Sequence, residues 1–223
     1  MWKELLHQKT LLSGLLALAL LGNGLGGGQP LEGTSPYTQA LIQHQEASFT
    51  RISREHERAR LLYEARVRDR IAEVISNYRT GLKFEKHSRV PEVILEESRK
   101  YGFDPLFLTA VIVAESSFYN WAKSRRGALG LMQIRPRTAR ALASEKEMVW
   151  KGKLTLYDPI QNISLGAYYL NKLIERFGDL SLALEAYNHG PSQLNRYLRK
   201  GKRPHRYSRK VLSLYRQLRL QSI

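Results

Sequence analysis

Glu115 is the residue whose type and position could support acid–base chemistry. It follows an apolar stretch, and the residues three and four positions before it are Ile112 and Val111, so a helix would place its carboxylate on an apolar face. Burial against apolar side chains disfavours the charged form of a carboxyl group. A glutamic acid that keeps its proton near neutral pH can act as a general acid. The helix pattern alone also allows a boundary residue whose carboxylate reaches water.

Two local signals predict the helix that must position Glu115. Asp104 can accept a hydrogen bond from the first turn, and Pro105 fits the first helical position because its missing N–H would have no partner there. A preceding helix is expected to open at Pro91 and to end at Gly102. The two helices should therefore join through a very short turn.

Three motifs follow one another along the chain. They are Glu-Ser-Ser-Phe at 115–118, the glycine-hinged loop Gly-Ala-Leu-Gly-Leu-Met-Gln-Ile at 127–134, and Ala-Tyr-Asn-His-Gly-Pro at 186–191. In this order they resemble the catalytic domain of the soluble lytic transglycosylases, which cleave the glycan strands of bacterial peptidoglycan on an all-helical, lysozyme-like fold. The resemblance extends from about Val90 to Tyr215, over half of the chain. It identifies Glu115 as the expected catalytic residue.

The resemblance implies roles for residues of the second and third motifs. Ser124 and Gln133 would hydrogen-bond sugar and acetamido groups, and Met132 would pack on the floor of the cleft. Tyr187 would lie beside the acid, and Asn188 would fix the loop that follows it. For Met132, simple core packing explains the residue equally well.

Ser116 and Tyr207 complete the expected substrate-binding set. Ser116 follows the acid directly and is expected to brace the helix end, because serine readily bonds nearby backbone groups. Tyr207 matches the tyrosine of the family's closing motif Tyr-Val-x-x-Val-Leu. The family often has Glu-Thr-Arg before this tyrosine, whereas Arg-Pro-His stands at 203–205, and Arg135 replaces a frequent Met. These departures put the subsite preference in doubt rather than the reaction.

The motif segments contain one candidate catalytic carboxylate, although most glycoside hydrolases use two. Glu185 lies two residues before Tyr187, so a helix would turn it away from that tyrosine, and it is interpreted as a surface residue. Asp158 is interpreted as a helix cap. The family's reaction needs one carboxyl group, because the N-acetyl group of N-acetylmuramic acid (MurNAc) stabilises the cation that forms when the acid protonates the glycosidic oxygen.

The resemblance therefore implies a complete reaction without a metal or a cofactor. The same Glu115 would deprotonate the C6 hydroxyl of MurNAc, which closes a 1,6-anhydro ring and cleaves the β-1,4 bond to N-acetylglucosamine. A goose-type lysozyme, which uses water instead of this hydroxyl, is the first alternative. A non-catalytic glycan-binding scaffold of the cell envelope is the second, and the intact Glu115 and Tyr187 argue against it.

The 223-residue chain carries a formal net charge of +16, which implies acidic surroundings such as nucleic acid, anionic lipid or the carboxylate-bearing peptides of a cell wall. No recognisable nucleic-acid-binding motif is present, so nucleic acid is not an expected partner. Between Ser116 and Ser144 there is no acidic residue but six basic ones. This segment is either a solvated face or a surface that attracts anionic substrate.

The first residues predict export to the periplasm. Lys3 and Lys9 precede an apolar run at 11–21 and a glycine-rich stretch, as in a bacterial signal peptide, so residues 1–28 are interpreted as a signal peptide or an uncleaved inner-membrane anchor. The run is shorter than the roughly 20 residues that span a bilayer. The chain contains no cysteine, which excludes a lipoprotein attachment site and disulfides.

Residues 29–82 are interpreted as a linker and a long amphipathic helical arm, and residues 83–223 as the catalytic domain, with the boundary near Phe84. The arm could pack across the catalytic domain, form a short coiled coil or dock a protein of the envelope machinery. No segment has the alternating pattern of a strand. The expected class is all-α, a lysozyme-like helical domain preceded by the arm.

Overall fold

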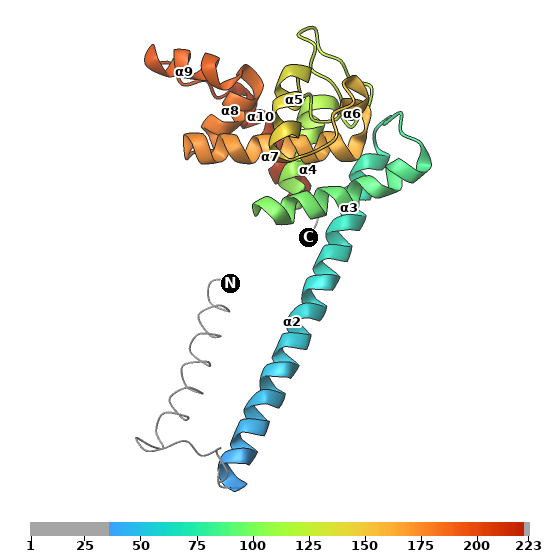
Figure 1. Ribbon diagram of the computed structural model, residues 1–223, viewed down its shortest axis with the longest axis vertical. Helices are drawn as coiled ribbons and strands as arrows, with labels where there is room; N and C mark the ends of the chain where they lie inside the picture. The colour runs from blue at the N-terminus through green and yellow to red at the C-terminus, as the bar shows by residue number, and fades with distance from the viewer. Residues whose placement is uncertain (1–35, 221–223) are drawn as a thin grey trace. The chain divides into compact units, whose positions relative to one another are not determined.

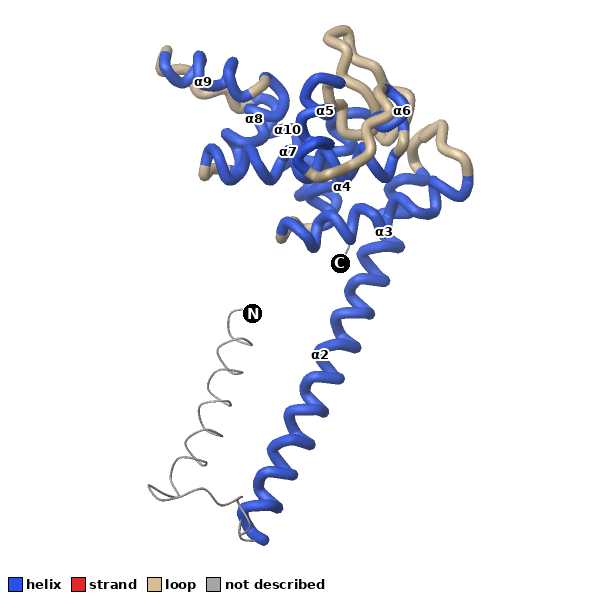
Figure 2. The backbone as a smooth tube through the Cα atoms, viewed as in Figure 1, coloured by secondary structure: helices blue, strands red, loops and turns tan. Residues whose placement is uncertain are grey.

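The computed structural model describes residues 36–220, and within them the chain is all-α, which confirms the expected class. Figure 2 shows helices joined by loops. The expected signal segment and residues 29–35 of the linker lie outside the described residues. None of the helices described is long and apolar enough to cross a membrane. The helices are α2 (Pro36–Ser76), α3 (Phe84–Tyr101), α4 (Pro105–Ser116), α5 (Pro136–Glu145), α6 (Lys153–Tyr157), α7 (Pro159–Phe177), α8 (Leu180–His189), α9 (Pro191–Arg199) and α10 (Arg206–Leu220).

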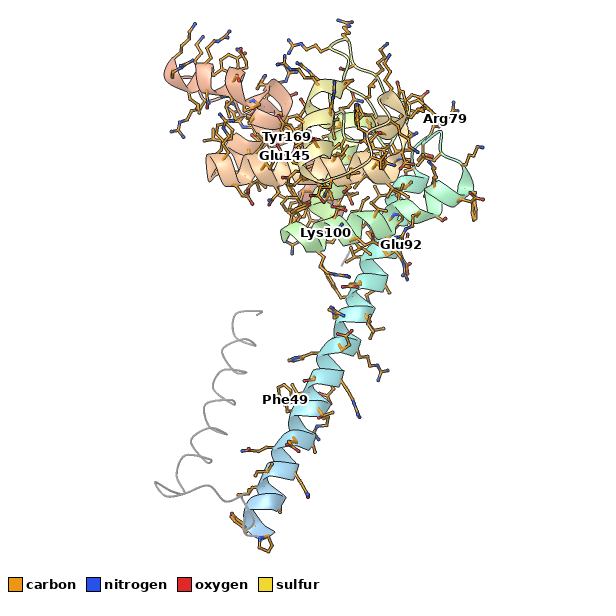
Figure 3. The ribbon with its side chains drawn as sticks, in the orientation of Figure 1. Phe49, Arg79, Glu92, Lys100, Glu145 and Tyr169 are labelled. Carbon is orange, nitrogen blue, oxygen red and sulfur yellow. The ribbon has the colours of Figure 1, made fainter. Side chains whose placement is uncertain are left out.

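The chain divides into two units between Glu55 and His56, within α2. In the first unit the described part of α2 exposes large apolar side chains, among them Leu41, Phe49 and Ile52. Figure 3 labels Phe49 on this helix. Among residues 36–55, the described part of this unit, α2 is the one element.

The second unit includes the C-terminal half of α2. Val67, Ile71, Val74 and Ile75 are buried in the main hydrophobic core, together with residues of α3, α4, α7 and α10. Their spacing of three to four residues places them on one face of the helix. The structure therefore differs from the expected boundary near Phe84: the apolar stripe of the arm becomes part of the core, because the second unit has apolar surface that covers it.

Helix α3 also begins earlier than expected. It starts at Phe84, and Pro91 lies in its interior instead of opening it. A proline inside a helix lacks the N–H that would bond the carbonyl four residues earlier. Val90 and Pro91 are nevertheless buried against the core, so packing of this face offsets the lost hydrogen bond.

Helix α4 lies at the centre of the second unit. Leu108, Val111 and Ile112 have no exposed surface, and the other residues from Leu106 to Val113 are buried as well. Helix α10 packs beside α4 and α8, and α7 packs between α3 and α8 (Figure 1). Because α4 is enclosed, its C-terminal residues are held by groups from several distant parts of the chain.

A loop from Ser117 to Arg135 follows α4, and Asn162 of α7 holds it in place. The Asn162 side chain accepts from Met132 N at 2.7 Å and donates to the carbonyls of Leu129 at 3.1 Å and Leu156 at 2.8 Å. Gly130 allows this approach, because a Cβ there would lie 2.2 Å from the Leu156 carbonyl oxygen. Its φ of 78° is also a conformation that favours glycine.

The buried stripe of α2 gives a stability prediction. Replacing Ile71, which is 0% exposed, with Ala should lower the free energy of unfolding by about 2–5 kcal/mol, because it removes buried methyl groups and leaves a cavity. Ile52→Ala on the same helix is the matched control. Ile52 is 46% exposed, so its loss should cost about 0.5 kcal/mol or less. Urea unfolding followed by circular dichroism measures both, and equal effects would contradict the assignment of this stripe to the core.

Candidate active site

The helix that carries Glu115 begins as its sequence predicts. The Asp104 carboxylate accepts a hydrogen bond from Leu106 N at 2.8 Å, and Pro105 occupies the first turn. The helix ends at Ser116, and Ser117 adopts the left-handed conformation with a φ of 50°. Glu115 is therefore the penultimate residue of α4, where the apolar interior gives way to the loop that follows.

The carboxyl group of Glu115 is half-buried and is held mainly by α10. Desolvation raises the pKa of Glu115 to about 7, against the smaller opposing effects of a hydrogen bond from Tyr207 and the positive charge of Lys210. The Tyr207 hydroxyl donates to Oε1 of Glu115. A carboxyl group with this pKa can both give and take a proton near neutral pH, as acid–base catalysis requires.

Two tyrosines surround the acid without competing for its proton. Burial and the negative charge of Glu115 raise the pKa values of Tyr187 and Tyr207 well above the usual range, so both phenols keep their protons and act as donors. The Tyr187 hydroxyl donates to the Met132 carbonyl at 2.7 Å, and its ring lies 5.3 Å from that of Tyr169, which Figure 3 labels. The third motif is thereby fastened to the second.

The backbone of the second motif is bonded to Ser116, the residue that follows the acid. The Ser116 hydroxyl donates to the Leu131 carbonyl at 2.7 Å, which ties the end of α4 to the loop as expected for a brace. The side chain of Met132 is 0% exposed and packs on Gly166, where a Cβ would come within 2.3 Å of its sulfur. Of the two explanations for Met132, the structure favours core packing, because a fully buried side chain presents no surface to a ligand.

Ser124 and Gln133 lie on the same loop and retain unused hydrogen-bonding capacity. The Ser124 hydroxyl oxygen accepts from Ala128 N at 2.9 Å, which leaves its proton to donate. The Gln133 amide donates to the carbonyls of Ala122 at 3.1 Å and Gly130 at 2.9 Å, which leaves its carbonyl oxygen to accept. Both side chains are half-buried, while Asn188 is exposed near the end of α8.

The structure adds two residues that the sequence analysis missed. Lys210 donates to the Ala114 carbonyl at 2.6 Å and so places a positive charge at the C-terminal end of α4, next to Glu115. Its spacing of three residues from Tyr207 on a helix is the signal that could have revealed it. Asn162, which clamps the loop, lies in the first turns of α7 and carries no comparable signal.

The structure contradicts the interpretation of Glu185 as a surface residue. It is 0% exposed, and its carboxylate accepts a hydrogen bond from Ser208 N at 2.8 Å. Its position between apolar residues in Leu-Ala-Leu-Glu-Ala-Tyr was the available signal for burial. As for metals, residues 36–220 contain no group of three or more His, Cys, Asp or Glu side chains that could hold an ion.

The balance of forces on Glu115 can be tested by titration. Tyr207→Phe removes a hydrogen bond that favours the carboxylate, so the pKa of Glu115 should rise from about 7 by about one or two, because a hydrogen bond to a charged group contributes about 1.5–3 kcal/mol. Carboxyl ¹³C NMR over a pH series measures this. Tyr215→Phe is the control, since Tyr215 of the same helix donates to Asp104 at the other end of α4. An unchanged or lower pKa in the Tyr207 variant would contradict the assignment.

Comparison with known proteins finds relatives that are similar to this chain in sequence. A transglycosylase of Enterobacteria phage PRD1 is 39% identical over 104 residues, covering 47% of this chain and 36% of that protein. A putative soluble lytic murein transglycosylase of Haemophilus influenzae is 33% identical over 93 residues, covering 41% of this chain and 16% of that protein. The chain thus matches about a third and a sixth of the lengths of these relatives.

Solved structures with the same arrangement of helices belong to much longer proteins. An inactive mutant of the lytic transglycosylase Slt from Pseudomonas aeruginosa superposes with a TM-score of 0.52 and 27% identity, covering 59% of this chain and 24% of that one. The 70 kDa soluble lytic transglycosylase of Escherichia coli has a TM-score of 0.53 at 24% identity, covers 61% and 25% of the two chains, and shows the fold alone.

The family itself is established by a match over more than half of the chain. The family model described as the transglycosylase SLT domain matches residues 92–209, a range that begins within α3 and ends in the first turns of α10. It includes Glu115, all three motifs and Tyr207. The protein therefore belongs to the transglycosylase SLT domain family.

Proposed function

We propose that this protein is a peptidoglycan lytic transglycosylase that uses Glu115 first as acid and then as base. The observation that carries the proposal is the position of Glu115 at the end of the buried apolar helix α4, where the Tyr207 hydroxyl donates to its carboxyl group. Desolvation in this position raises the pKa of Glu115 to about 7. Near neutral pH both protonation states of such a group are populated, so it can serve as acid in the first half of a two-step reaction and as base in the second.

In the first half, protonated Glu115 gives its proton to the glycosidic oxygen between MurNAc and N-acetylglucosamine. The bond from MurNAc C1 to that oxygen breaks, and the N-acetylglucosamine side leaves as an alcohol. The positive charge that develops at C1 is stabilised by the acetamido oxygen of the same sugar. Glu115 is left as a carboxylate, which the Tyr207 hydroxyl and the positive charge of Lys210 stabilise.

In the second half, the Glu115 carboxylate takes the proton of the MurNAc C6 hydroxyl. The C6 oxygen bonds to C1, closes the 1,6-anhydro ring and displaces the acetamido oxygen. Glu115 is then protonated again and ready for the next cycle. No water, metal or second carboxylate takes part, so one acidic side chain is sufficient.

The remaining site residues would orient the glycan. The free hydroxyl proton of Ser124 and the free carbonyl oxygen of Gln133 support contacts with sugar hydroxyl or acetamido groups. Tyr187 and Ser116 would act by holding the loop, since their hydroxyls bond its backbone. Asn188, which is exposed, would line the edge of the site.

The proposed setting is the bacterial periplasm, with peptidoglycan strands as substrate. Export rests on the signal-like residues 1–28, and an uncleaved anchor would hold the enzyme at the inner membrane. We assign residues 29–55 to the linker and arm and place the start of the catalytic unit within α2, at His56. The exposed apolar residues of the arm would serve a partner protein of the envelope.

Replacing Glu115 with Gln tests the proposal. The amide keeps the shape of the side chain but cannot donate the proton, so release of anhydro-muropeptides from purified peptidoglycan should fall by at least about 100-fold. Mass spectrometry of the products measures this, with circular dichroism to establish that the variant is folded. Products that end in reducing MurNAc would instead support the goose-type lysozyme, and anhydro products from the Gln variant would remove Glu115 from its role.

The basic segment after α4 gives a second test. Lys123, Arg125 and Arg126 are exposed and pair with no described carboxylate, so they can attract the anionic peptides of intact sacculi. Changing all three to Gln should lower the rate on sacculi at low salt and flatten its salt dependence, since the Debye length falls from about 10 Å at 0.1 M to about 3 Å at 1 M. Peptide-free glycans should be cleaved at the parent rate.

The control for this test removes the same charge elsewhere on the chain. Arg51, Arg54 and Arg58 of α2 are exposed, and their change to Gln should leave the salt dependence as in the parent. If both triple variants behave alike on sacculi, net charge alone accounts for the effect and the segment does not steer substrate.

A further inference from the structure

Glu185 is a fully buried acid that the proposed reaction does not use. It lies on α8, has 0% exposed surface, and directs one carboxylate oxygen at the backbone N–H of Ser208, 2.8 Å away. Its other oxygen lies 3.4 Å from Nε2 of His189, one turn further along the same helix. A buried carboxylate is costly unless it is compensated, so its retention in the core calls for a physical reason.

The compensation comes from the start of α10. Ser208 belongs to the first turn of that helix, whose N–H groups have no partners within the helix and carry partial positive charge. The first turn of α10 contains no acidic residue of its own. Glu185 therefore supplies, from α8, the negative group and hydrogen-bond acceptor that the N-terminal end of α10 lacks.

The same contact bears on the catalytic acid. The N–H that Glu185 accepts belongs to the peptide bond between Tyr207 and Ser208, so it fixes the backbone directly after Tyr207. The Tyr207 hydroxyl in turn donates to Glu115. Ser208 has 2% exposed surface, which leaves water little access to replace the acceptor. A connected path thus runs from Glu185 through the first turn of α10 to Glu115.

We propose that Glu185 is a positioning residue: by accepting the hydrogen bond of Ser208 N–H, it fixes the start of α10 so that the Tyr207 hydroxyl stays on Glu115. The inference rests on the proposed function only in so far as Glu115 is the acid, because the hydrogen bonds hold whichever reaction follows. Glu185 touches no substrate in this assignment and acts through Tyr207 alone.

The experiment compares three changes at one position. Glu185→Leu removes the acceptor, Glu185→Asp keeps the charge but withdraws it by one methylene, and Glu185→Gln keeps an acceptor oxygen at the same reach. The Leu and Asp variants should raise the pKa of Glu115 in the direction given by Tyr207→Phe and lower turnover by about 10- to 100-fold, since small misplacements near the reacting groups cost this much. The Gln variant should lie closer to the parent in both measures.

The control variant separates positioning from stability. Glu97 of α3 is also buried, at 4% exposure, and pairs with Lys100, so Glu97→Leu should lower thermal stability as Glu185→Leu does. It should leave the pKa of Glu115 and the pH profile of turnover unchanged. If Glu185 has a purely structural role, its own variants should also leave the pKa of Glu115 and the pH profile of turnover unchanged. An unchanged pKa and pH profile in the folded Leu or Asp variant would overturn the proposal.

A double variant completes the test. If Glu185 acts through Tyr207, Glu185→Asp together with Tyr207→Phe should lower turnover little further than Tyr207→Phe alone, because both changes break one path. If the losses of turnover caused by the two single changes multiply in the double variant, the inference is overturned. Carboxyl ¹³C NMR reads the pKa of Glu115 without reference to the reaction, so a failure of this inference is distinguishable from a failure of the proposed function, which the products of the Glu115→Gln variant decide.

Discussion

The hydrogen bond from Tyr207 to Glu115 joins residues 92 positions apart in the sequence, and the chemistry of the site depends on it. Burial on α4 alone would hold the carboxyl group protonated, and a protonated acid that never releases its proton cannot catalyse anything. The phenol donor and the charge of Lys210 oppose that effect and leave the pKa of Glu115 at about 7. The packing of α10 beside α4 therefore constrains the protonation of Glu115 as well as the fold.

Three side chains of the second unit hold the loop that follows α4 in place by hydrogen bonds to its backbone. Asn162, the Tyr187 hydroxyl and the Ser116 hydroxyl each bond a backbone group of the loop between Leu129 and Met132. Glycines permit the close approaches, most clearly Gly130 against the Leu156 carbonyl. A loop held at this many backbone points can present Ser124 and Gln133 in fixed positions, although it has almost no regular secondary structure.

Local signals in the sequence predicted the elements that depend on local physics. The cap and proline at the start of α4 predicted the helix, and the order of the three motifs indicated Glu115 as the candidate acid. The same reasoning turned Glu185 away from the face of Tyr187, and in the structure the two side chains have different partners, because Tyr187 bonds Met132 while Glu185 bonds Ser208. The interpretation as a surface residue was wrong because α10 covers Glu185. The apolar neighbours of Glu185 in the sequence indicated burial but not which helix would cover it.

The beginning of the catalytic unit illustrates the same limit. The sequence predicted an amphipathic helix correctly but could not indicate what its apolar stripe would meet, so packing across the domain, a short coiled coil and docking of a partner remained as alternatives. In the structure, Val67, Ile71 and Ile75 fill the core, and the connection from α2 to α3 continues the contact.

That connection reaches the segment directly after Glu115. The Thr80 carbonyl accepts from Asn120 N at 2.9 Å, and the Gly81 carbonyl accepts from Nε1 of Trp121 at 3.1 Å. The ring of Tyr78 lies 6.0 Å from that of Phe118, which has no exposed surface. Since Asn120 and Trp121 lie between Glu115 and Ser124, the connection from α2 to α3 supports the segment that joins these two candidate site residues. A unit that began after residue 82 would lack both this core stripe and this support, and for this reason we propose a boundary inside α2.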